Sequence, residues 1–277
     1  MDSFIDMHVH TTASDGTFTP SEVVDLAHEI GLSAIAITDH DTVSGFAEAE
    51  RQSELYGMEI IPGIEFSTKY KGRVHLLGYY IDTKCSELLE ELDNIVKDRD
   101  KRNEKIVDLM RQDGIDISYD GMKERFGEVI GRPHFATILV ENGFAPTTKD
   151  AFEAYVGKGK KYWLPRSTIT MERCIELIRI AGGTPILAHL FEYKYDTKSL
   201  QELIEYCFSI GISGVEVRHP SHTLEQMMFL EEQCDMRGIV KTGGSDFHGS
   251  VKPDNPLGVP QVPHSWLREV RKAAVKI

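Results

Sequence analysis

The chain has 277 residues, of which 41% are hydrophobic and 27% are charged, so it is long enough to bury a full core, and global disorder is excluded. Its 31 basic and 44 acidic residues give a net charge of −13, which argues against wrapping of duplex DNA because that mode depends on dense neutralisation of phosphates. No apolar run reaches the roughly 18 residues that a membrane span needs, and no basic leader precedes the first strand, so we expect a soluble, cytoplasmic protein.

Short runs rich in Val and Ile alternate with helix-like segments through the first third of the chain. Strands are predicted at Phe4–Val9, Ser33–Thr38, Met58–Phe66 and Arg73–Ile81. The tetrapeptide Thr19-Pro20-Ser21-Glu22 has the pattern of a capping box and begins a helix that Gly31 ends. A longer charged helix is predicted over about Glu87–Arg111.

The alternation stops between about residues 97 and 163. Helix-like pieces follow one another there without a good strand, including Pro133–Asn142 and Lys149–Val156. The stretch carries 13 basic and 12 acidic residues, so it repels an anion less than the strongly acidic remainder does. We therefore expect residues 1–96 and 164–277 to form the two parts of one barrel domain, with residues 97–163 as a small helical insertion subdomain.

The alternation resumes in the last third of the chain. Helices at Met171–Ala181, Leu200–Ile210 and Leu224–Arg237 alternate with strands at Thr184–Ala188, Gly214–Val217 and Ile239–Thr242. About seven strands in βα units, which are typical of a parallel sheet, favour a closed (β/α) barrel, with a doubly wound open sheet as the alternative. The cysteines lack CxxC spacing and are expected to be reduced and packed: Cys85, Cys174, Cys207 and Cys234.

Histidines and carboxylates stand at the ends of successive predicted strands. His8 and His10 are two residues apart at the end of the first strand, so both point to the same side. His40, Glu65, His189, Asp246 and His248 also end or follow predicted strands, while Asp15 lies in the loop after His10 and His75 lies within the fourth strand. Because a parallel βα barrel gathers its active site at the carboxyl ends of its strands, we expect these side chains to converge.

Imidazole and carboxylate groups suit divalent zinc, manganese or iron, and these six histidines and three carboxylates exceed the ligand number of a single ion. We expect two or three divalent metal ions, with Glu65 or Asp246 as the bridging carboxylate. For His219 and His222, which follow the strand at Gly214–Val217, a structural role and a role in the site both remain open.

Several motifs together carry a family resemblance. The phrases DMHVHTTASDGTFTP, ITDHDTVSG, PGIEFS, HLLGYY, AHL and GGSDFHG, in this order, resemble the polymerase and histidinol phosphatase (PHP) family of the amidohydrolase superfamily. The resemblance is strongest to a short bacterial phosphoesterase branch that includes enzymes acting on nucleoside 3′,5′-bisphosphates and on the 5′ ends of short RNA. That branch also has an insertion that opens with a phrase like GRPHFA, found here at Gly131–Ala136.

The resemblance implies an α/β fold built as a distorted seven-stranded (β/α) barrel. It also implies a division of the metal ligands. One ion would be bound by His8, His10, Glu65 and Asp246, and another by Asp15, His40 and His248, while His75 and His189 would complete a third site or hold substrate.

These features predict a phosphoesterase that acts on a small phosphorylated metabolite through metal-activated hydroxide, with a nucleoside 3′,5′-bisphosphate or a short oligoribonucleotide as the favoured substrate. Arg132 is expected to bind the phosphate, and His134 to orient it or to protonate the leaving alcohol. His189 is the other candidate for that proton, provided that metal does not fully engage it.

Other functions remain open from the sequence. Among phosphoesterases, the alternatives are a cyclic phosphate dihydrolase, a histidinol phosphate phosphatase and a 5′-to-3′ exonuclease on short RNA. Outside the phosphoesterases, the alternatives are an amidohydrolase-type C–N hydrolase and a non-catalytic metal-binding module. Arg132 separates the first class from the C–N hydrolases, because a phosphate site needs a cation besides the metals and an amide site does not.

Overall fold

The protein is described by a computed structural model that covers residues 3–127, 129–165 and 168–274. It divides into two compact units. The first consists of Met1–Leu92 with Thr168–Ile277, and the second of Asp93–Ser167. The predicted insertion, residues 97–163, falls within the second unit. Among the described residues there is no helix long and apolar enough to cross a membrane.

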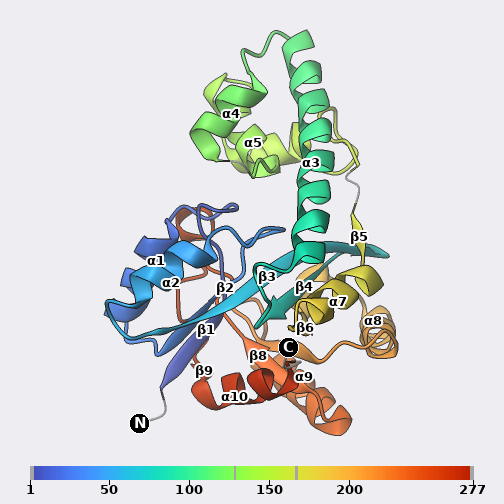
Figure 1. The fold of residues 1–277 in the computed structure, drawn as a ribbon. Coiled ribbons are helices and arrows are strands. Elements are labelled where there is room, and N and C mark those ends of the chain that lie inside the picture. The colour runs from blue at the N-terminus through green and yellow to red at the C-terminus, as the bar shows by residue number, and fades with distance from the viewer. Residues whose placement is uncertain (1–2, 128, 166–167, 275–277) are drawn as a thin grey trace. The chain divides into compact units, whose positions relative to one another are not determined.

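A single sheet organises the first unit, with strands in the order β8-β7-β6-β4-β3-β2-β1-β9 and β5 paired to β3 (Figure 1). The strands are β1 (Phe4–Val9), β2 (Ala34–Ile37), β3 (Glu59–Tyr70), β4 (Gly72–Tyr79), β5 (Ile169–Thr170), β6 (Thr184–Leu187), β7 (Gly214–Arg218), β8 (Val240–Gly243) and β9 (Val262–Pro263). All seven predicted strands are present. The predicted count is nevertheless too low for the described part of the chain, because β5 and β9 add two strands of two residues each.

Strand β4 corrects the expectation of a uniformly parallel sheet. It runs antiparallel to both β3 and β6, whereas β1, β2 and β3 are mutually parallel, as are β6, β7 and β8. The reason is the connection, since only Lys71 separates β3 from β4, and so short a turn joins only antiparallel strands. The reversal places His75, in the first half of β4, opposite Ser67 in the second half of β3.

The sheet closes through the segment after β8. A parallel bridge joins Val9 to Phe247. The backbone N–H of His10 donates to the carbonyl of Phe247 (2.9 Å), and that of Phe247 donates to the carbonyl of His8 (3.3 Å). These bonds make the sheet a nearly closed barrel, so the predicted α/β barrel class is confirmed and the open doubly wound alternative is wrong.

Helices cover the outside of the barrel sheet, and several follow their predicted bounds closely. In the first unit they are α1 (Pro20–Glu29), α2 (Phe46–Ser53), α7 (Met171–Ile180), α8 (Thr197–Ser209), α9 (Leu224–Arg237) and α10 (His264–Ala273). The predicted capping box is confirmed at α1, where Thr19 Oγ1 accepts from the N–H of Glu22 (3.2 Å) and Glu22 Oε2 accepts from the N–H of Thr19 (2.7 Å). The sequence analysis did not predict α2 and α10.

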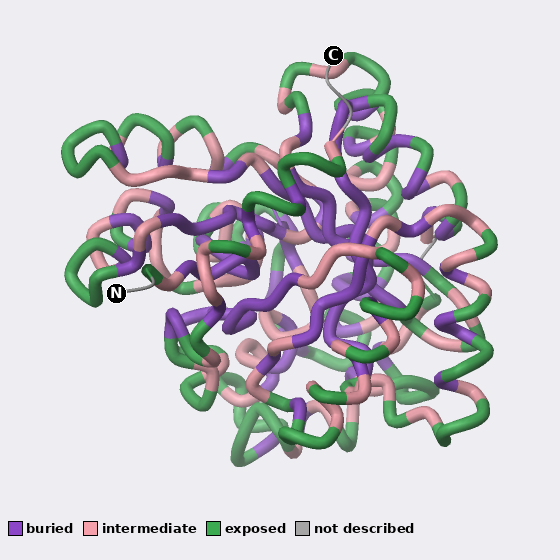
Figure 2. The backbone as a smooth tube through the Cα atoms, turned by 90° about the horizontal axis from the view of Figure 1, so that it is seen from below, coloured by how far each residue is buried: buried purple, intermediate pink, exposed green. Residues whose placement is uncertain are grey.

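Burial follows the strands. The strands β1, β2 and β6 are almost wholly buried, and Figure 2 shows buried stretches of chain in the interior with exposed turns around them. Ile5, Met7 and Val9 on one face of β1 and Asp6 and His8 on the other are all buried, so both faces of this strand are covered, as expected for a barrel strand between an inner layer and outer helices.

The second unit has a core of its own. It contains α4 (Tyr119–Phe126), α5 (Arg132–Glu141), α6 (Thr148–Ala151) and a π-helical turn at Phe152–Val156, together with the last part of α3 (Ser86–Gln112). Met110, Phe135 and Leu139 are fully buried in this core. The unit therefore packs around its own apolar cluster.

Candidate metal centre

All nine predicted metal ligands lie in the first unit and form overlapping groups. The side-chain nitrogen and oxygen atoms within each group lie within 4.8 Å of one another. The groups are His8, His10, Glu65 and Asp246; His10, Asp15, His40 and His248; and His40, Glu65 and His75. His189 joins them through Glu65, as described next. The strands thus bring together residues from positions 8 to 248.

Glu65 lies at the centre of the cluster and is 1% exposed. Its Oε2 atom is 3.4 Å from His8 Nε2, 3.2 Å from His10 Nε2 and 2.9 Å from His40 Nδ1. Its Oε1 atom is 2.7 Å from His75 Nδ1 and 2.9 Å from His189 Nε2. The two oxygens face two sets of histidines, which is the geometry of a bridging carboxylate.

The two aspartates face the remaining histidines. Asp246 Oδ1 lies 3.5 Å from His8 Nε2 and 3.4 Å from His10 Nε2. Asp15 Oδ1 lies 3.3 Å from His248 Nε2 and 3.7 Å from His10 Nδ1. Asp15 is the most exposed of these carboxylates, at 23% of its side chain, so the cluster is more open to solvent on its side.

The donor atoms fit divalent metal ions. Several buried side-chain atoms in the cluster have no hydrogen-bond partner among the described residues: His8 Nε2, both ring nitrogens of His10, His40 Nδ1, His75 Nε2, His189 Nδ1 and Glu65 Oε2. Buried polar atoms are rarely left unpaired in folded proteins. Imidazole nitrogens and carboxylate oxygens that converge without partners are the donor set that zinc, manganese or iron uses.

Hydrogen bonds from outside the cluster fix which ring nitrogen points inward. His8 Nδ1 lies 2.8 Å from Glu216 Oε1, and His248 Nδ1 lies 2.8 Å from the carbonyl of Asp246. Both oxygens only accept here, so when either ring is neutral its Nδ1 carries the proton and its Nε2 presents a lone pair. Metal ligands in proteins are commonly oriented in this way.

The sequence analysis missed Glu216, although a signal was present. A carboxylate inside the apolar strand GVEVR, with 0% exposure, needs a buried partner. Besides contacting His8, Glu216 accepts a hydrogen bond at Oε2 from the backbone N–H of His189 (2.7 Å). It therefore contacts two residues of the cluster at once.

The pKa values show that the buried histidines and carboxylates shift one another's protonation. Burial alone would raise the pKa of Glu216, but the positive charge of His8 and its hydrogen bond lower that pKa to about 2. Burial alone would lower the pKa of His10, but the nearby carboxylates of Asp246 and Glu65 raise it to about 9. For His75 burial dominates and lowers the pKa to about 3. The carboxylates thus stay ionised inside the protein only beside positive charge.

Backbone geometry at two ligands is unusual. His189 has φ of 24° and Asp246 has φ of 52°, which are strained values for residues with a Cβ. Asp6 helps to hold the loop before Asp246: its Oδ1 accepts from the N–H groups of His8 (3.1 Å) and Ser245 (3.0 Å). The surrounding bonds therefore maintain a conformation that the ligands would not adopt alone.

The predicted phosphate-binding residues lie in the second unit, at the first turn of α5. The Arg132 guanidinium lies 5.9 Å from the centre of the Phe152 ring. The His134 ring stacks on Phe126 at 4.8 Å, and its Nδ1 accepts a hydrogen bond from the N–H of Gly131 (3.1 Å). Neutral His134 consequently carries its proton on Nε2 and can donate from that atom.

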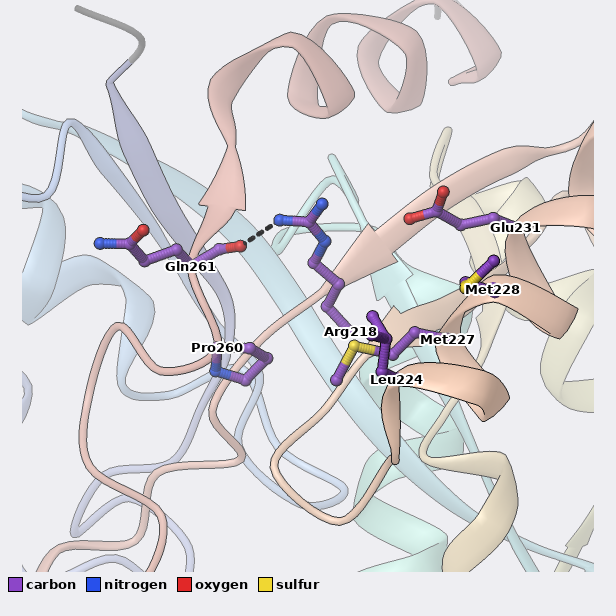
Figure 3. Close-up of a pocket in the computed structure, with 7 residues that line it drawn as sticks. All are labelled: Arg218, Leu224, Met227, Met228, Glu231, Pro260 and Gln261. Carbon is purple, nitrogen blue, oxygen red and sulfur yellow. Dashed lines mark hydrogen bonds between the residues drawn. The ribbon is translucent and has the colours of Figure 1, made fainter.

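A pocket of about 460 Å³ lies elsewhere in the first unit, at the start of α9 (Figure 3). It is lined by Arg218, Leu224, Met227, Met228, Glu231, Pro260 and Gln261. Arg218 is tied to the pocket wall, since its Nη1 donates to the carbonyl of Gln261 (2.6 Å). None of the nine clustered residues lines this pocket, so we assign it no part in the metal centre.

Comparison with known proteins agrees with this geometry. The PHP domain model matches residues 6–217. A 5′-3′ exoribonuclease of Haemophilus influenzae is 34% identical over 247 residues, covering 88% of this chain and 89% of that protein. A 3′,5′-nucleoside bisphosphate phosphatase of Chromobacterium violaceum is 32% identical over 257 residues, covering 92% and 90%.

A solved structure is also similar. A proposed metal-dependent phosphoesterase from Bifidobacterium adolescentis superposes with a TM-score of 0.86 at 31% identity, covering 99% of this chain and 98% of the other.

Proposed function

Because this chain belongs to the PHP domain family and is a metal-dependent phosphoesterase, we propose that its substrate is a small nucleotide, either a nucleoside 3′,5′-bisphosphate or a short oligoribonucleotide. The relatives named for these two activities support the proposal, since each is more than 30% identical over most of both chains. The observation that carries the hydrolytic part is the convergence of buried, unpartnered donor atoms around Glu65 and Asp246.

In this proposal the nine clustered side chains hold two or three divalent ions of manganese, zinc or iron. Such ions supply a nucleophile near neutral pH by lowering the pKa of water, and they stabilise charge that develops on phosphate oxygens. Glu65 separates the two halves of the cluster. We assign His189 to the half that contains His75, because its Nε2 and His75 Nδ1 both face Glu65 Oε1 (2.9 and 2.7 Å).

Arg132 and His134 supply the remaining chemistry in the proposal. The planar guanidinium of Arg132 forms paired hydrogen bonds to phosphate oxygens, and His134 donates from Nε2 to the phosphate or to the leaving alcohol. Arg132 and His134 are two residues apart in the first turn of α5, and both start from the positive end of that helix, which favours a bound anion.

One assay tests the proposal. Manganese-loaded protein is incubated with nucleoside 3′,5′-bisphosphates, 5′-phosphorylated short RNA, cyclic phosphates, histidinol phosphate and an amide panel, and released phosphate, nucleotide and amine are measured. We expect turnover of bisphosphate or RNA, abolished by chelator and by His10→Ala. Turnover of the amides alone would overturn the substrate class.

Arg132 gives a second test with a matched control. Arg132→Ala should lower kcat/KM for the phosphate ester by roughly 10²-fold. Arg111→Ala, which changes an exposed arginine in the same unit, should leave it unchanged. Equal activity of the two variants would remove Arg132 from the proposal.

A further inference from the structure

His219 lies beside the cluster, and one of its buried ring nitrogens has no hydrogen-bond partner in the described part of the chain. It follows β7 directly, is 0% exposed, and its Nε2 atom lies 3.5 Å from Asp246 Oδ2. That nitrogen has no hydrogen-bond partner among the described residues. A buried polar atom of this kind is costly unless a ligand or water satisfies it.

The local backbone determines which group His219 presents. The N–H of Ser221 points at His219 Nδ1 at 3.1 Å, and Ser221 Oγ lies 2.8 Å from the same atom. A backbone N–H can only donate, so Nδ1 holds a lone pair and neutral His219 carries its proton on Nε2. This is the reverse of His8 and His248, whose Nδ1 atoms face oxygen acceptors.

This orientation argues against a further metal site. Glu192, His219 and Asp246 have atoms within 4.8 Å of one another, as a cation site would require. His219 Nε2–H offers no lone pair to a cation, however, and the Lys252 ammonium already forms an ion pair with Asp246 Oδ2. The place therefore suits an oxygen acceptor rather than a metal ion.

Asp246 divides the site into two chemical faces. Its Oδ1 atom faces His8 and His10, whose Nε2 atoms are unpartnered among the described residues. Its Oδ2 atom faces two donors, His219 Nε2–H and the Lys252 ammonium. The second face reaches solvent, since the side chain of Lys252 is 38% exposed and that of Glu192 is 36% exposed.

We propose that His219 and Lys252 form an anion-binding pair at the edge of the metal centre, where both donate to an oxygen of the substrate phosphate. The proposal rests on the phosphoesterase function given above and adds two substrate-binding residues to it. An anionic oxygen at this place satisfies the buried Nε2–H of His219 and gives the Lys252 ammonium an acceptor other than Asp246.

The protonated nitrogen of His219 is measured directly by ¹⁵N NMR of the zinc-loaded protein at pH 8, with His219→Gln identifying the signal. We expect Nε2 to carry the proton and Nδ1 to be unprotonated. The opposite assignment, with an unprotonated Nε2, would overturn the proposal whatever the enzyme's activity.

Phosphate binding tests the pair itself. Inorganic phosphate is titrated into manganese-loaded protein by calorimetry. His219→Ala and Lys252→Met should each raise the Kd roughly ten- to hundredfold, because each removes a hydrogen bond to a charged group. His219→Gln, which keeps a side-chain N–H donor, should lose less than His219→Ala. An unchanged Kd in His219→Ala and Lys252→Met would refute the pair.

Matched controls and metal analysis complete the experiment. His222→Ala changes another buried histidine, whose Nδ1 bonds instead to the carbonyl of Val217 (2.9 Å), and Lys241→Met changes a lysine paired with Asp235; neither should alter the Kd. Bound metal per chain should stay at the wild-type value in His219→Ala, and loss of an ion would make His219 a ligand. A wild-type protein that binds phosphate through this pair but hydrolyses no ester would contradict the proposed function alone.

Discussion

Both oxygens of Glu216 are engaged with the metal centre, one by the His8 ring and the other by the backbone of His189. Glutamine has a single acceptor oxygen, so Glu216→Gln leaves one of these N–H groups without a partner. We predict that the variant binds manganese roughly 10- to 100-fold more weakly, as is typical when a group that orients a metal ligand is removed. Titration calorimetry with Glu225→Gln, an exposed glutamate on α9, as control measures the difference. Identical affinities would show that Glu216 does not orient the ligands.

The same carboxylate predicts a dependence of stability on pH in the metal-free protein. The fold lowers the pKa of Glu216 from its ordinary 4.5 to about 2, against the effect of burial, through the charge of His8. A lowered pKa stabilises the folded state above about pH 4.5, and this contribution is lost as the pH falls towards 2. Thermal melting of chelator-treated protein from pH 6 to pH 3 should therefore show a steeper fall in Tm for wild type than for Glu216→Gln. Parallel curves would contradict the assignment.

At the scale of elements, the loop after β8 presses against β1. A Cβ added at Gly244 would lie 2.4 Å from the backbone N of His8 and 2.5 Å from its Cβ. Gly244→Ala must push β8 and β1 apart, which we expect to cost about 1–3 kcal/mol and to weaken manganese binding. Gly78→Ala, whose Cβ would first meet the buried side chain of Ile178 and not a residue of the metal centre, should lose stability while retaining manganese affinity. Denaturant unfolding and metal titration of the two variants test this contrast.

The sequence predicts elements well where local pattern determines them. The seven main strands, the capping box of α1 and the convergence of His8, Glu65 and Asp246 all follow from periodicity and from the common edge of parallel strands. The direction of β4 does not, because strand pairing depends on contacts distant in sequence, although the six residues between the two predicted strands, 67–72, are too few for a parallel crossover. The orientation of the His219 ring was equally inaccessible, since the backbone after Pro220 determines it.

For the molecule as a whole, metal binding should be a large part of stability. The proposed metal ligands are far apart in the unfolded chain, so ions bind the folded state preferentially. They come from β1, β3, β4, the loops after β2 and β6, and the segment after β8. Free manganese at 100 times its Kd should add about 2.7 kcal/mol per independent site. Differential scanning calorimetry should show a higher Tm with manganese and a lower one with chelator. Calcium, which prefers oxygen-only sites, is the control ion and should shift the Tm less.

The closure of the barrel between β1 and the segment after β8 has a consequence for biosynthesis. A ribosome releases His8 and His10 long before Asp246 and His248, with the whole second unit made in between. A partly translated chain contains His8 and His10 but lacks Asp246 and His248. The complete set of proposed metal ligands, and with it hydrolytic activity, therefore exists only near the end of synthesis.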